Sequence, residues 1–337
     1  MIELRRSVLE GEILDPERGF EPRALRVEVR EDPLTGQTAR LLPPAGLMPP
    51  QDPDELRALG ERTRVGCPFC AGRVEAVTPK LPAEITADGR MRRGEALLFP
   101  NLLPYARFSS VSVYSPDRHV LALDELTPRL VADNLAAQVA WARACVEVEP
   151  SAAWVSINAN HMLPSGSSIF HPHLQGAVNP IPTTMQRLLS EVPPARFRDY
   201  LAQERTEGAR YLGRRDRVEW LASFAPLGSC ELRAFVQGVA SPTSLDAETV
   251  EELGAGIATA AGLYSELGYG SFNLALYGAP PGLDGYPLNL RMICRSSLAP
   301  FYRSDATWLE RLHWEAAVDT SPEELARAAG DRFTKPG

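Results

Sequence analysis

Two long segments of the chain repeat apolar residues about every three to four positions, the spacing of a helix that buries one face. Thr127 is a suitable N-cap for the first segment, with Pro128 at its first helical position. Asp246 stands at the corresponding place before the second segment. The faces that we expect to be buried comprise Leu130, Leu135, Val139 and Ala142 in the first helix, and Val250, Leu253, Ile257 and Leu263 in the second.

A predicted strand lies on each side of both helices. Residues 108–114 and 154–158 flank the first helix, and residues 231–237 and 271–277 flank the second. Because strand, long helix and strand follow one another twice, the chain is predicted to contain an internal duplication of an α+β unit. We expect an N-terminal unit over 1–185, a polar, arginine-rich linker over 186–217 and a C-terminal unit over 218–337.

Shorter elements are predicted near the ends of the chain. The turn sequence Asp32-Pro33-Leu34-Thr35-Gly36 predicts a short hairpin between residues 19 and 40. Five prolines within 41–54 favour an irregular arm, because proline removes a backbone donor and fixes φ. A last helix is predicted over 322–332.

The composition is that of a folded protein, since 44% of the 337 residues are apolar and 23% are charged. A net charge of −8 argues against a nucleic acid polymer as partner, because phosphate binding needs a basic surface. No apolar run approaches the roughly 18 residues of a membrane helix, and the N-terminus carries no apolar secretion segment. Five cysteines favour a reducing cytosol, so we expect a cytoplasmic protein without a membrane partner.

Candidate chemistry first occurs in Cys67-Pro68-Phe69-Cys70, which Ala71-Gly72 follows. Two thiolates at this spacing, on a turn shaped by Pro68 and Gly72, can bind one side of a tetrahedral zinc ion. Redox pairs share the spacing, although such a pair usually opens a helix after a strand. The pattern leaves a metal knuckle, a redox pair and two inert cysteines as alternatives, and the surrounding residues favour the metal.

Two of the five histidines stand two residues apart in His171-Pro172-His173-Leu174-Gln175. On an extended segment such positions face the same way. Because Pro172 cannot donate to a ladder, we expect this strand to lie at a sheet edge or at a site. The pair suits two metal ligands or one ligand beside one nucleophile, and two structurally satisfied histidines are the alternative.

The preceding segment, from Asn160 to Ser168, is a small polar loop with one glycine and three serines. Backbone N–H groups of such a loop can hold phosphate oxygens, although similar loops are also common surface turns.

A zinc ion bound by two thiolates needs two further ligands. We expect His171 to be one and His119 to be the other, with His161 as the competing candidate. His173 then remains free beside the polar loop, where a neutral imidazole can attack phosphorus.

Asn160, Gly166, Ser168 and His171-Pro-His-x-Gln175 occur in the order and spacing of the galactose-1-phosphate uridylyltransferase family, which the chain resembles over nearly its whole length. That family is a branch of the histidine-triad superfamily and includes ADP-sugar and dinucleoside-polyphosphate phosphorylases. Residues 32–37, 67–72, 99–101 and 114–119 resemble its N-terminal turn, zinc knuckle, nucleoside strand and third ligand segment. The resemblance implies an α+β fold of two tandem histidine-triad-like units, with long helices packed on antiparallel sheets.

The resemblance also implies a mechanism. His173 would attack the α-phosphorus of a nucleoside diphosphate sugar or a similar conjugate, and the nucleotidyl–histidine intermediate would pass its nucleotide to a phosphate-containing acceptor. Gln175 favours transfer over hydrolysis, because its amide has no useful acid–base pKa and hydrolases of the superfamily carry histidine there. The implied catalytic residues are His173, Gln175 and Ser168, and the implied contacts to substrate or nucleotide are Asn101, Asn160, Gly166, Ser167 and Glu315.

The implied metal is one structural Zn²⁺, which would hold the His171 end of the strand so that His173 is aimed. Its ligands would be Cys67, Cys70, His119 and His171. The histidines of the family's second metal site, near Tyr277 and within 288–292, are absent, so we expect a single zinc ion per chain.

The hexose side of the family's pattern is altered. Leu309 and Ser321 stand where the family presents a lysine and a glutamine, while Glu315 is retained. We therefore expect an acceptor other than galactose 1-phosphate. The arginines that we consider for the acceptor phosphate are Arg291, Arg295 and Arg303.

The leading interpretation is a cytoplasmic nucleotidyltransferase of this family. One alternative is a nucleoside-diphosphate-sugar or dinucleoside-polyphosphate phosphorylase with the same His173 intermediate. Another is a non-catalytic, zinc-stabilised nucleotide-binding protein. A homodimer is possible, because members of the family are commonly dimers.

Overall fold

The computed structural model describes residues 2–43, 50–283, 285–298 and 305–334. Its strands are β1 (Arg6–Asp15), β2 (Glu21–Glu31), β3 (Thr38–Leu41), β4 (Met91–Arg93), β5 (Ala96–Pro100), β6 (Phe108–Val113), β7 (Trp154–His161), β8 (His173–Asn179), β9 (Tyr211–Arg215), β10 (Val218–Ala222), β11 (Leu232–Val236), β12 (Ser271–Tyr277), β13 (Leu288–Arg295) and β14 (Ala316–Val318). Its helices are α1 (Pro53–Arg64), α2 (Val74–Val77), α3 (Pro128–Val148), α4 (Thr184–Ser190), α5 (Pro194–Glu207), α6 (Ala247–Glu266), α7 (Trp308–His313) and α8 (Pro322–Ala329).

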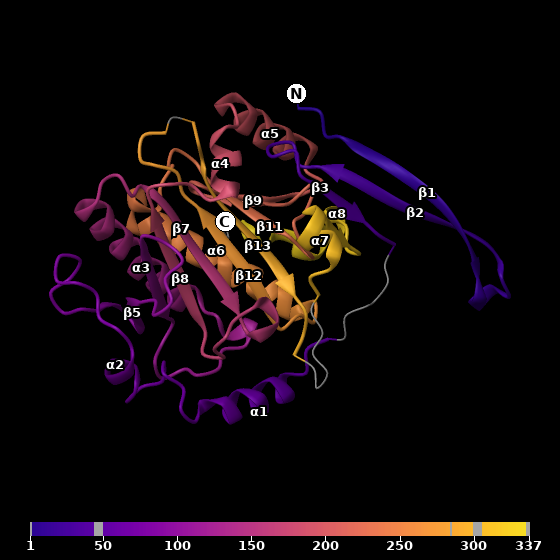
Figure 1. The fold of residues 1–337 in the computed structure, drawn as a ribbon. Coiled ribbons are helices and arrows are strands. Elements are labelled where there is room, and N and C mark those ends of the chain that lie inside the picture. The colour runs from indigo at the N-terminus through magenta and orange to yellow at the C-terminus, as the bar shows by residue number, and fades with distance from the viewer. Residues whose placement is uncertain (1, 44–49, 284, 299–304, 335–337) are drawn as a thin grey trace.

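A ten-stranded sheet forms the body, in the order β4-β5-β6-β8-β7-β12-β13-β11-β10-β9 (Figure 1). All neighbouring strands in it are antiparallel. Each half follows the same order along the chain, namely three strands, a long helix and two further strands. In the sheet, the three strands run inward from one edge, and the two further strands follow in reversed order, so that β8 lies next to β6 and β13 next to β11. This confirms the predicted duplication and the α+β class, with two tandem units joined where β7 pairs with β12.

Both long helices begin where the sequence predicts. The Thr127 hydroxyl accepts a hydrogen bond from the Leu130 amide, and the Asp246 carboxylate accepts one from the Thr249 amide. The two helices pack against each other on one face of the sheet. They approach closely at Gly254, where an added Cβ would stand 2.8 Å from the backbone nitrogen of Ala132.

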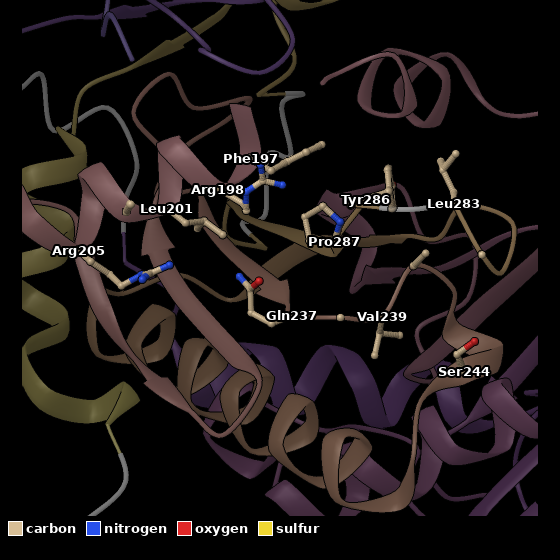
Figure 2. A pocket seen from close by; sticks show the side chains of 15 residues that line it. Phe197, Arg198, Leu201, Arg205, Gln237, Val239, Ser244, Leu283, Tyr286 and Pro287 are labelled. Carbon is tan, nitrogen blue, oxygen red and sulfur yellow. The ribbon is translucent and has the colours of Figure 1, made fainter. Parts of the chain in front are cut away.

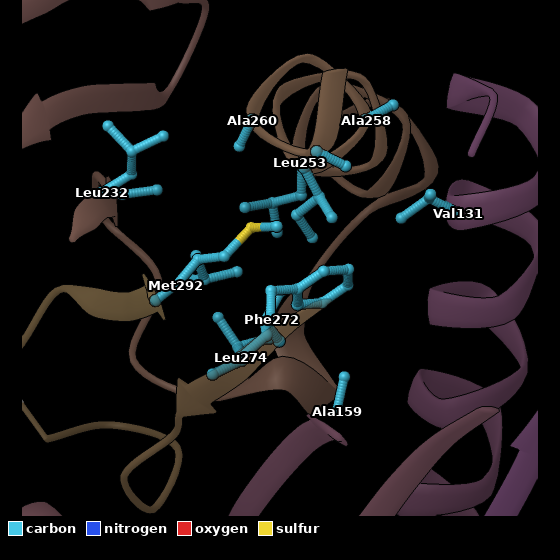
Figure 3. Packing of buried hydrophobic residues seen from close by; sticks show 14 of the residues in the cluster. Val131, Ala159, Leu232, Leu253, Ala258, Ala260, Phe272, Leu274 and Met292 are labelled. Carbon is cyan, nitrogen blue, oxygen red and sulfur yellow. The ribbon is translucent and has the colours of Figure 1, made fainter. Parts of the chain in front are cut away.

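The main core lies between these helices and the central strands. In Figure 3, Val131 of α3 and Leu253 of α6 lie on the helix side of the cluster, and Phe272 and Leu274 of β12 lie on the sheet side. Each of these side chains is buried, and burial of one such side chain contributes about 1.5–3 kcal/mol. The core therefore holds the junction between the two halves of the sheet.

The segment 186–217, expected to be a linker, is folded. It contains the end of α4, all of α5 and β9, and it packs Phe197 and Tyr200 against Phe235 of β11. The polar composition was misleading, because α5 exposes its arginines and buries its few aromatic residues. The division of the chain into units at 185 and 218 stays a prediction.

A second sheet, in the order β1-β2-β3-β14, contains the predicted hairpin. β2 and β3 pair around the turn at Asp32, whose carboxylate accepts hydrogen bonds from the amides of Leu34 (2.8 Å) and Thr35 (3.1 Å). The sequence analysis did not find β1, which pairs with β2 over its whole length.

Of the predicted irregular arm, residues 44–49 lie outside the described residues, and α1 begins at Pro53. The predicted last helix is α8, capped by Ser321. Within the described parts of the chain, no helix combines the length and the apolar character that crossing a bilayer requires.

Candidate functional site

The candidate site lies at one end of β8, in the middle of the large sheet. β8 pairs with β6 on one side and β7 on the other, so of the two places that Pro172 suggested, a sheet edge or a site, the sheet edge is excluded. Pro172 is tolerated because it lies just before His173, the first paired residue, which stands opposite Val113 of β6.

Alternation along β8 decides which side chains reach the site. Gly176 faces α3, where an added Cβ would stand 2.2 Å from Oε1 of Gln138. His173 and Gln175 therefore face the opposite side of the sheet. Asn160 of β7 faces the same side, because its neighbour Ala159 belongs to the core under the helices.

Among the described residues, one group has the composition and spacing of a metal site: Cys67, Cys70, His119 and His171, whose ligand atoms all lie within 4.8 Å of one another. The Sγ atom of Cys70 lies 3.3 Å from Nδ1 of His119 and 3.6 Å from Nδ1 of His171. Sγ of Cys67 lies 3.8 Å from Nδ1 of His171. A tetrahedral ion with zinc-like bond lengths places sulfur and nitrogen ligands about 3.5 Å apart, so the group fits such an ion.

The outer nitrogens of both histidines are also occupied. Nε2 of His171 lies 2.9 Å from the carbonyl oxygen of Ser115, and Nε2 of His119 lies 3.0 Å from Oγ1 of Thr63. A hydrogen bond at Nε2 fixes the tautomer whose Nδ1 is free to bind a metal. Both rings are thus oriented for coordination through Nδ1.

The electrostatics of the cluster also suit a cation. Burial and the neighbouring Cys67 raise the pKa of the Cys70 thiol to about 11, and burial lowers the pKa of His171 to about 4. Neutral imidazoles are the form that binds metal ions. A bound dication reverses the pKa shift of the Cys70 thiol, because coordinating thiols lose their protons. The Cys₂His₂ group can therefore bind a metal ion.

His161, the competing ligand candidate, lies outside this cluster. Its ring stacks on Phe272 with centroids 4.8 Å apart, and its Nε2 lies 3.0 Å from the carbonyl oxygen of Leu121. Burial lowers its pKa to about 4, so the ring is neutral at physiological pH. The geometry favours His119 as the fourth ligand.

His173 is buried, and both of its ring nitrogens have neighbours. Nδ1 lies 2.9 Å from the backbone oxygen of His171, which can only accept, so Nδ1 carries the proton. Nε2 then holds a lone pair and lies 3.4 Å from the side-chain nitrogen of Gln175. The ring packs edge-on against Phe69 of the cysteine turn. Burial lowers the pKa of His173, although the hydrogen bond to His171 opposes the shift, so the neutral form is favoured.

The polar loop after β7 is closed by hydrogen bonds of its own. The amide of Gly166, at a φ of +94°, donates to the carbonyl of Leu163 at 2.9 Å. The Ser167 hydroxyl donates to the carbonyl of Ile169 at 2.6 Å. These two groups are thus engaged within the loop, and the contacts of Gly166 and Ser167 with phosphate stay predictions. Ser168 is exposed.

Asn273 of β12, which the sequence analysis missed, reaches this loop from the second half. Its side-chain nitrogen donates to Oδ1 of Asn160 at 2.7 Å and to the carbonyl of Ser165 at 2.8 Å. Arg295 donates to Oδ1 of Asn273 at 2.7 Å and is itself held by Asp305. A lone asparagine in a strand gives no sequence signal, and only the pairing of β7 with β12 reveals its place.

Two further predicted residues, Asn101 and Glu315, lie outside the group of residues at the start of β8. Asn101 follows β5, and its Oδ1 accepts a hydrogen bond from the Leu103 amide at 3.1 Å. Glu315 lies beside the small sheet, where Arg40 of β3 donates to its carboxylate at 2.8 Å. The structure does not bring Glu315 together with the β8 residues.

The arginines considered for an acceptor phosphate are mostly engaged. Arg291 is buried and donates to the carboxylates of Asp32 (2.7 Å) and Glu231 (2.8 Å). Arg295 pairs with Asp305, and Arg303 lies outside the described residues. Of the two that the structure describes, Arg295 is placed beside the loop, through Asn273.

The second half contains a cavity of about 630 Å³ between α5, the end of β11 and the start of β13 (Figure 2). Gln237 and Val239, just after β11, and Pro287, just before β13, line it opposite Leu201 of α5. In the duplicated plan this is the counterpart of the His173 end. It is lined by no histidine or cysteine, so the chemistry of the first half is not repeated there.

Comparison with known proteins shows which solved structures share this fold. No family model matches the chain. An ADP-glucose phosphorylase from Arabidopsis thaliana, solved with bound ADP-glucose, is 17% identical with a TM-score of 0.64, over 90% of this chain and 98% of that chain. A GalT-like protein from the same plant gives 16% and 0.63, over 89% and 97%. A uridylyltransferase structure gives 21% and 0.59, over 90% and 98%.

The chain thus has the fold of these GalT-like, ADP-glucose phosphorylase and uridylyltransferase structures, as the sequence resemblance predicts. In sequence it is 31% identical to an uncharacterized protein of Archaeoglobus fulgidus over 314 residues, which cover 89% of this chain and 91% of that protein. The chain belongs to the same family as this archaeal protein.

Proposed function

We propose that the protein is a nucleotidyltransferase that moves a nucleoside monophosphate between phosphate-containing substrates through a covalent bond to His173. The observation that carries the proposal is the protonation pattern of this ring. The backbone oxygen of His171 lies 2.9 Å from Nδ1 of His173 and fixes the proton on that nitrogen. The lone pair of Nε2 is then the nucleophile.

In the first step, Nε2 would form a bond to the α-phosphorus of a nucleoside diphosphate conjugate. The bond between that phosphorus and the bridging oxygen breaks, and its electron pair leaves with the departing phosphate. The imidazole ring gains positive charge, which the His171 carbonyl stabilises through Nδ1–H. No proton needs to move.

In the second step, a phosphate oxygen of the acceptor attacks the same phosphorus, and the electron pair of the N–P bond returns to Nε2. Gln175 faces the ring from the same strand, and its amide can donate to a phosphoryl oxygen without acting as an acid or base. We assign Ser168 and Asn160 to the phosphates. Asn101 is assigned to the nucleoside.

We propose Zn²⁺ for the Cys₂His₂ group, because two thiolates and two imidazoles in tetrahedral spacing suit zinc. Four protein ligands leave no open position, so the ion would be structural. Cys67, Cys70, His119 and His171 would fix the start of β8, and with it the backbone carbonyl that orients His173.

We infer that the acceptor is not galactose 1-phosphate. Leu309, at the position of the family's lysine, lies in α7, and Ser321 uses its hydroxyl to cap α8 with Glu324. Neither offers a contact for a hexose phosphate. The same observation favours a second candidate, a phosphorylase whose acceptor is free phosphate and needs no sugar contact.

Isotope exchange tests the covalent route without knowledge of the acceptor. The protein is incubated with ADP-glucose, UDP-glucose or GDP-mannose and with the matching labelled sugar 1-phosphate. A covalent intermediate predicts that label enters the nucleotide sugar in one of these mixtures, and that His173→Asn abolishes exchange while His313→Asn, an exposed control, does not. Exchange by His173→Asn, or none with any conjugate, contradicts the proposal.

The choice of acceptor distinguishes the second candidate, the phosphorylase, from the transferase. Inorganic phosphate in place of the sugar phosphate should release a nucleoside diphosphate if the protein is a phosphorylase. A transferase specific for sugar phosphates should release none.

A further inference from the structure

The cavity between α5, the end of β11 and the start of β13 is lined by none of the residues assigned to the His173 reaction (Figure 2). Its volume of about 630 Å³ lies within the range of pockets that hold small ligands. It lies on the sheet face that carries His173, because α5 packs on Phe235, whereas Ala234 and Val236 belong to the core under the long helices. On this face the second half thus presents a cavity where the first half presents its histidines.

One side of α5 forms a wall of this cavity. Its lining residues, at helix positions i, i+3, i+4 and i+7, are Arg198, Leu201, Ala202 and Arg205. Leu201 is buried, both arginines are exposed, and Figure 2 shows Leu201 between them. The wall therefore has an apolar centre with a guanidinium group toward each end.

A buried carboxylate positions two polar groups of the cavity. Glu219 of β10 is fully buried, and one of its oxygens lies 2.9 Å from Nε of Arg205. Its other oxygen accepts a hydrogen bond of 3.1 Å from the side-chain nitrogen of Gln237. A guanidinium group carries further N–H donors on its Nη atoms, and the Gln237 amide retains its oxygen as an acceptor. The cavity thus holds donors and an acceptor in fixed places.

The opposite side of the cavity is mostly apolar. Val239, Tyr286 and Pro287 line it and are buried. The Tyr286 hydroxyl donates to the carbonyl of Tyr277 at 2.8 Å, so the polar end of this ring already has its partner. Such a surface suits a ring in a bound ligand.

The charges in the cavity select an anion. None of the described residues that line it is acidic, and two of them are arginines. Two guanidinium groups favour a ligand with about two negative charges, which a phosphate monoester supplies near neutral pH. The described lining residues also include no histidine, cysteine or lysine, so the cavity offers no base that could activate the Ser244 hydroxyl.

We propose that this cavity is a second ligand site, which binds a ring-bearing phosphate monoester, a nucleotide or a sugar phosphate, without converting it. Arg198 and Arg205 hold the phosphate, and the ring packs between Leu201 and Pro287. The Gln237 oxygen accepts a hydrogen bond from a hydroxyl or amino group of the ligand. This site goes beyond the proposed nucleotidyl transfer and does not depend on it.

Equilibrium dialysis of the full chain against labelled AMP, glucose 1-phosphate and inorganic phosphate tests the site. Ala202→Phe fills the cavity from an exposed helix position and should abolish the binding of AMP or glucose 1-phosphate at this site, whereas the matched control Ala202→Ser should keep it. Binding at the His173 site is common to both variants, so it cancels from the difference between them. The comparison therefore holds whether or not the His173 reaction occurs.

A second pair of variants tests the charge. Arg198→Gln should weaken the same binding by about tenfold or more, because one charged donor is lost. Arg187→Gln, an exposed arginine of α4 outside the cavity, should not weaken it. Because Arg198 is itself exposed, this variant keeps the test valid if Ala202→Phe does not fold, which thermal unfolding without ligand reveals.

The order of affinities identifies the ligand. Tighter binding of AMP than of glucose 1-phosphate assigns the ring to a nucleoside, and the reverse order assigns it to a sugar. Inorganic phosphate bound as tightly as both esters would contradict a ring on the apolar wall. The proposal is overturned if no probe binds, or if folded Ala202→Phe and Arg198→Gln both bind as wild type does.

Discussion

The side chain of Asn273 donates a hydrogen bond of 2.7 Å to the side-chain oxygen of Asn160, and so connects the two halves of the protein at the candidate site. The two residues stand opposite each other in the pairing of β12 with β7. The same Asn273 nitrogen donates to the carbonyl of Ser165 within the polar loop. A residue of the second half thus positions the loop of the first half.

Replacement of Asn273 by alanine should slow nucleotidyl transfer by about 10- to 100-fold, because Asn160 and the loop lose the donor that fixes them. Asn273→Asp should be at least as slow, since a carboxylate cannot donate and repels Oδ1 of Asn160. The rate of isotope exchange measures the effect.

The matched control is Asn179→Ala, a half-buried asparagine at the other end of β8. It should leave the exchange rate within a few-fold of wild type. Equal losses in both variants would indicate a general loss of structure rather than a positioning role for Asn273.

Local signals in the sequence were sufficient for the long helices and for the cysteine half of the metal site. Thr127 and Asp246 cap helices through their own neighbours, and the Cys67–Cys70 spacing defines half of a metal site without knowledge of the fold. The resemblance supplied the rest of the site. His119 and His171 come together with the cysteines within 4.8 Å, as the sequence analysis expected.

The features that were missed depend on contacts between distant segments. Asn273 reaches Asn160 only because β12 pairs with β7, and Arg291 is bound by Asp32, a residue 259 positions away. The resemblance implied a phosphate contact at Gly166, but it did not indicate that the Gly166 amide donates a hydrogen bond within the loop. Neither a register between strands nor a loop's internal hydrogen bonds can be read from residue types.

The buried Asp32 carboxylate predicts a pH dependence of stability. Burial opposes its ionisation, but the guanidinium groups of Arg233 and Arg291 and the Leu34 amide outweigh burial and lower the pKa of Asp32 from 3.8 to about 2. A carboxyl whose pKa falls on folding stabilises the folded state above its unfolded pKa. Its contribution, about 2 kcal/mol, is present above pH 4 and is lost as the pH falls toward 2.

Urea unfolding of wild type and Asp32→Asn at several pH values measures this contribution. At pH 7 the variant should lose about 3–5 kcal/mol, because two buried guanidinium groups lose their shared partner. The difference between the two proteins should shrink between pH 4 and pH 2. A difference that stays constant down to pH 2 would contradict the lowered pKa.

The Cys₂His₂ cluster should hold about one zinc ion per chain in protein purified without chelators. Cys67→Ser and His119→Asn should each lose most of the metal, because a structural site needs all four ligands. His161→Asn should keep its zinc, since that ring stacks on Phe272 outside the cluster. Elemental analysis decides the matter, and metal-free protein with a Cys67–Cys70 disulfide would refute the site.

Galactose 1-phosphate should be a poor acceptor. The Ser321 hydroxyl is committed to the cap of α8, and Leu309 carries no charge to bind a phosphate. Unmet polar groups of a bound hexose cost about 1–3 kcal/mol each. A mixture of UDP-glucose and galactose 1-phosphate should yield little or no UDP-galactose, and robust turnover would show that other residues replace the missing pair.

The covalent bond to His173 is tested most directly by intact-mass spectrometry after brief incubation with each nucleoside diphosphate sugar. We expect wild-type protein to gain the mass of one nucleotidyl group with at least one conjugate, and peptide mapping to place that group on the segment that contains His173. His173→Asn should gain no mass while it keeps its zinc and its fold. The absence of any adduct with every conjugate, or an adduct on His173→Asn, would contradict the proposed mechanism.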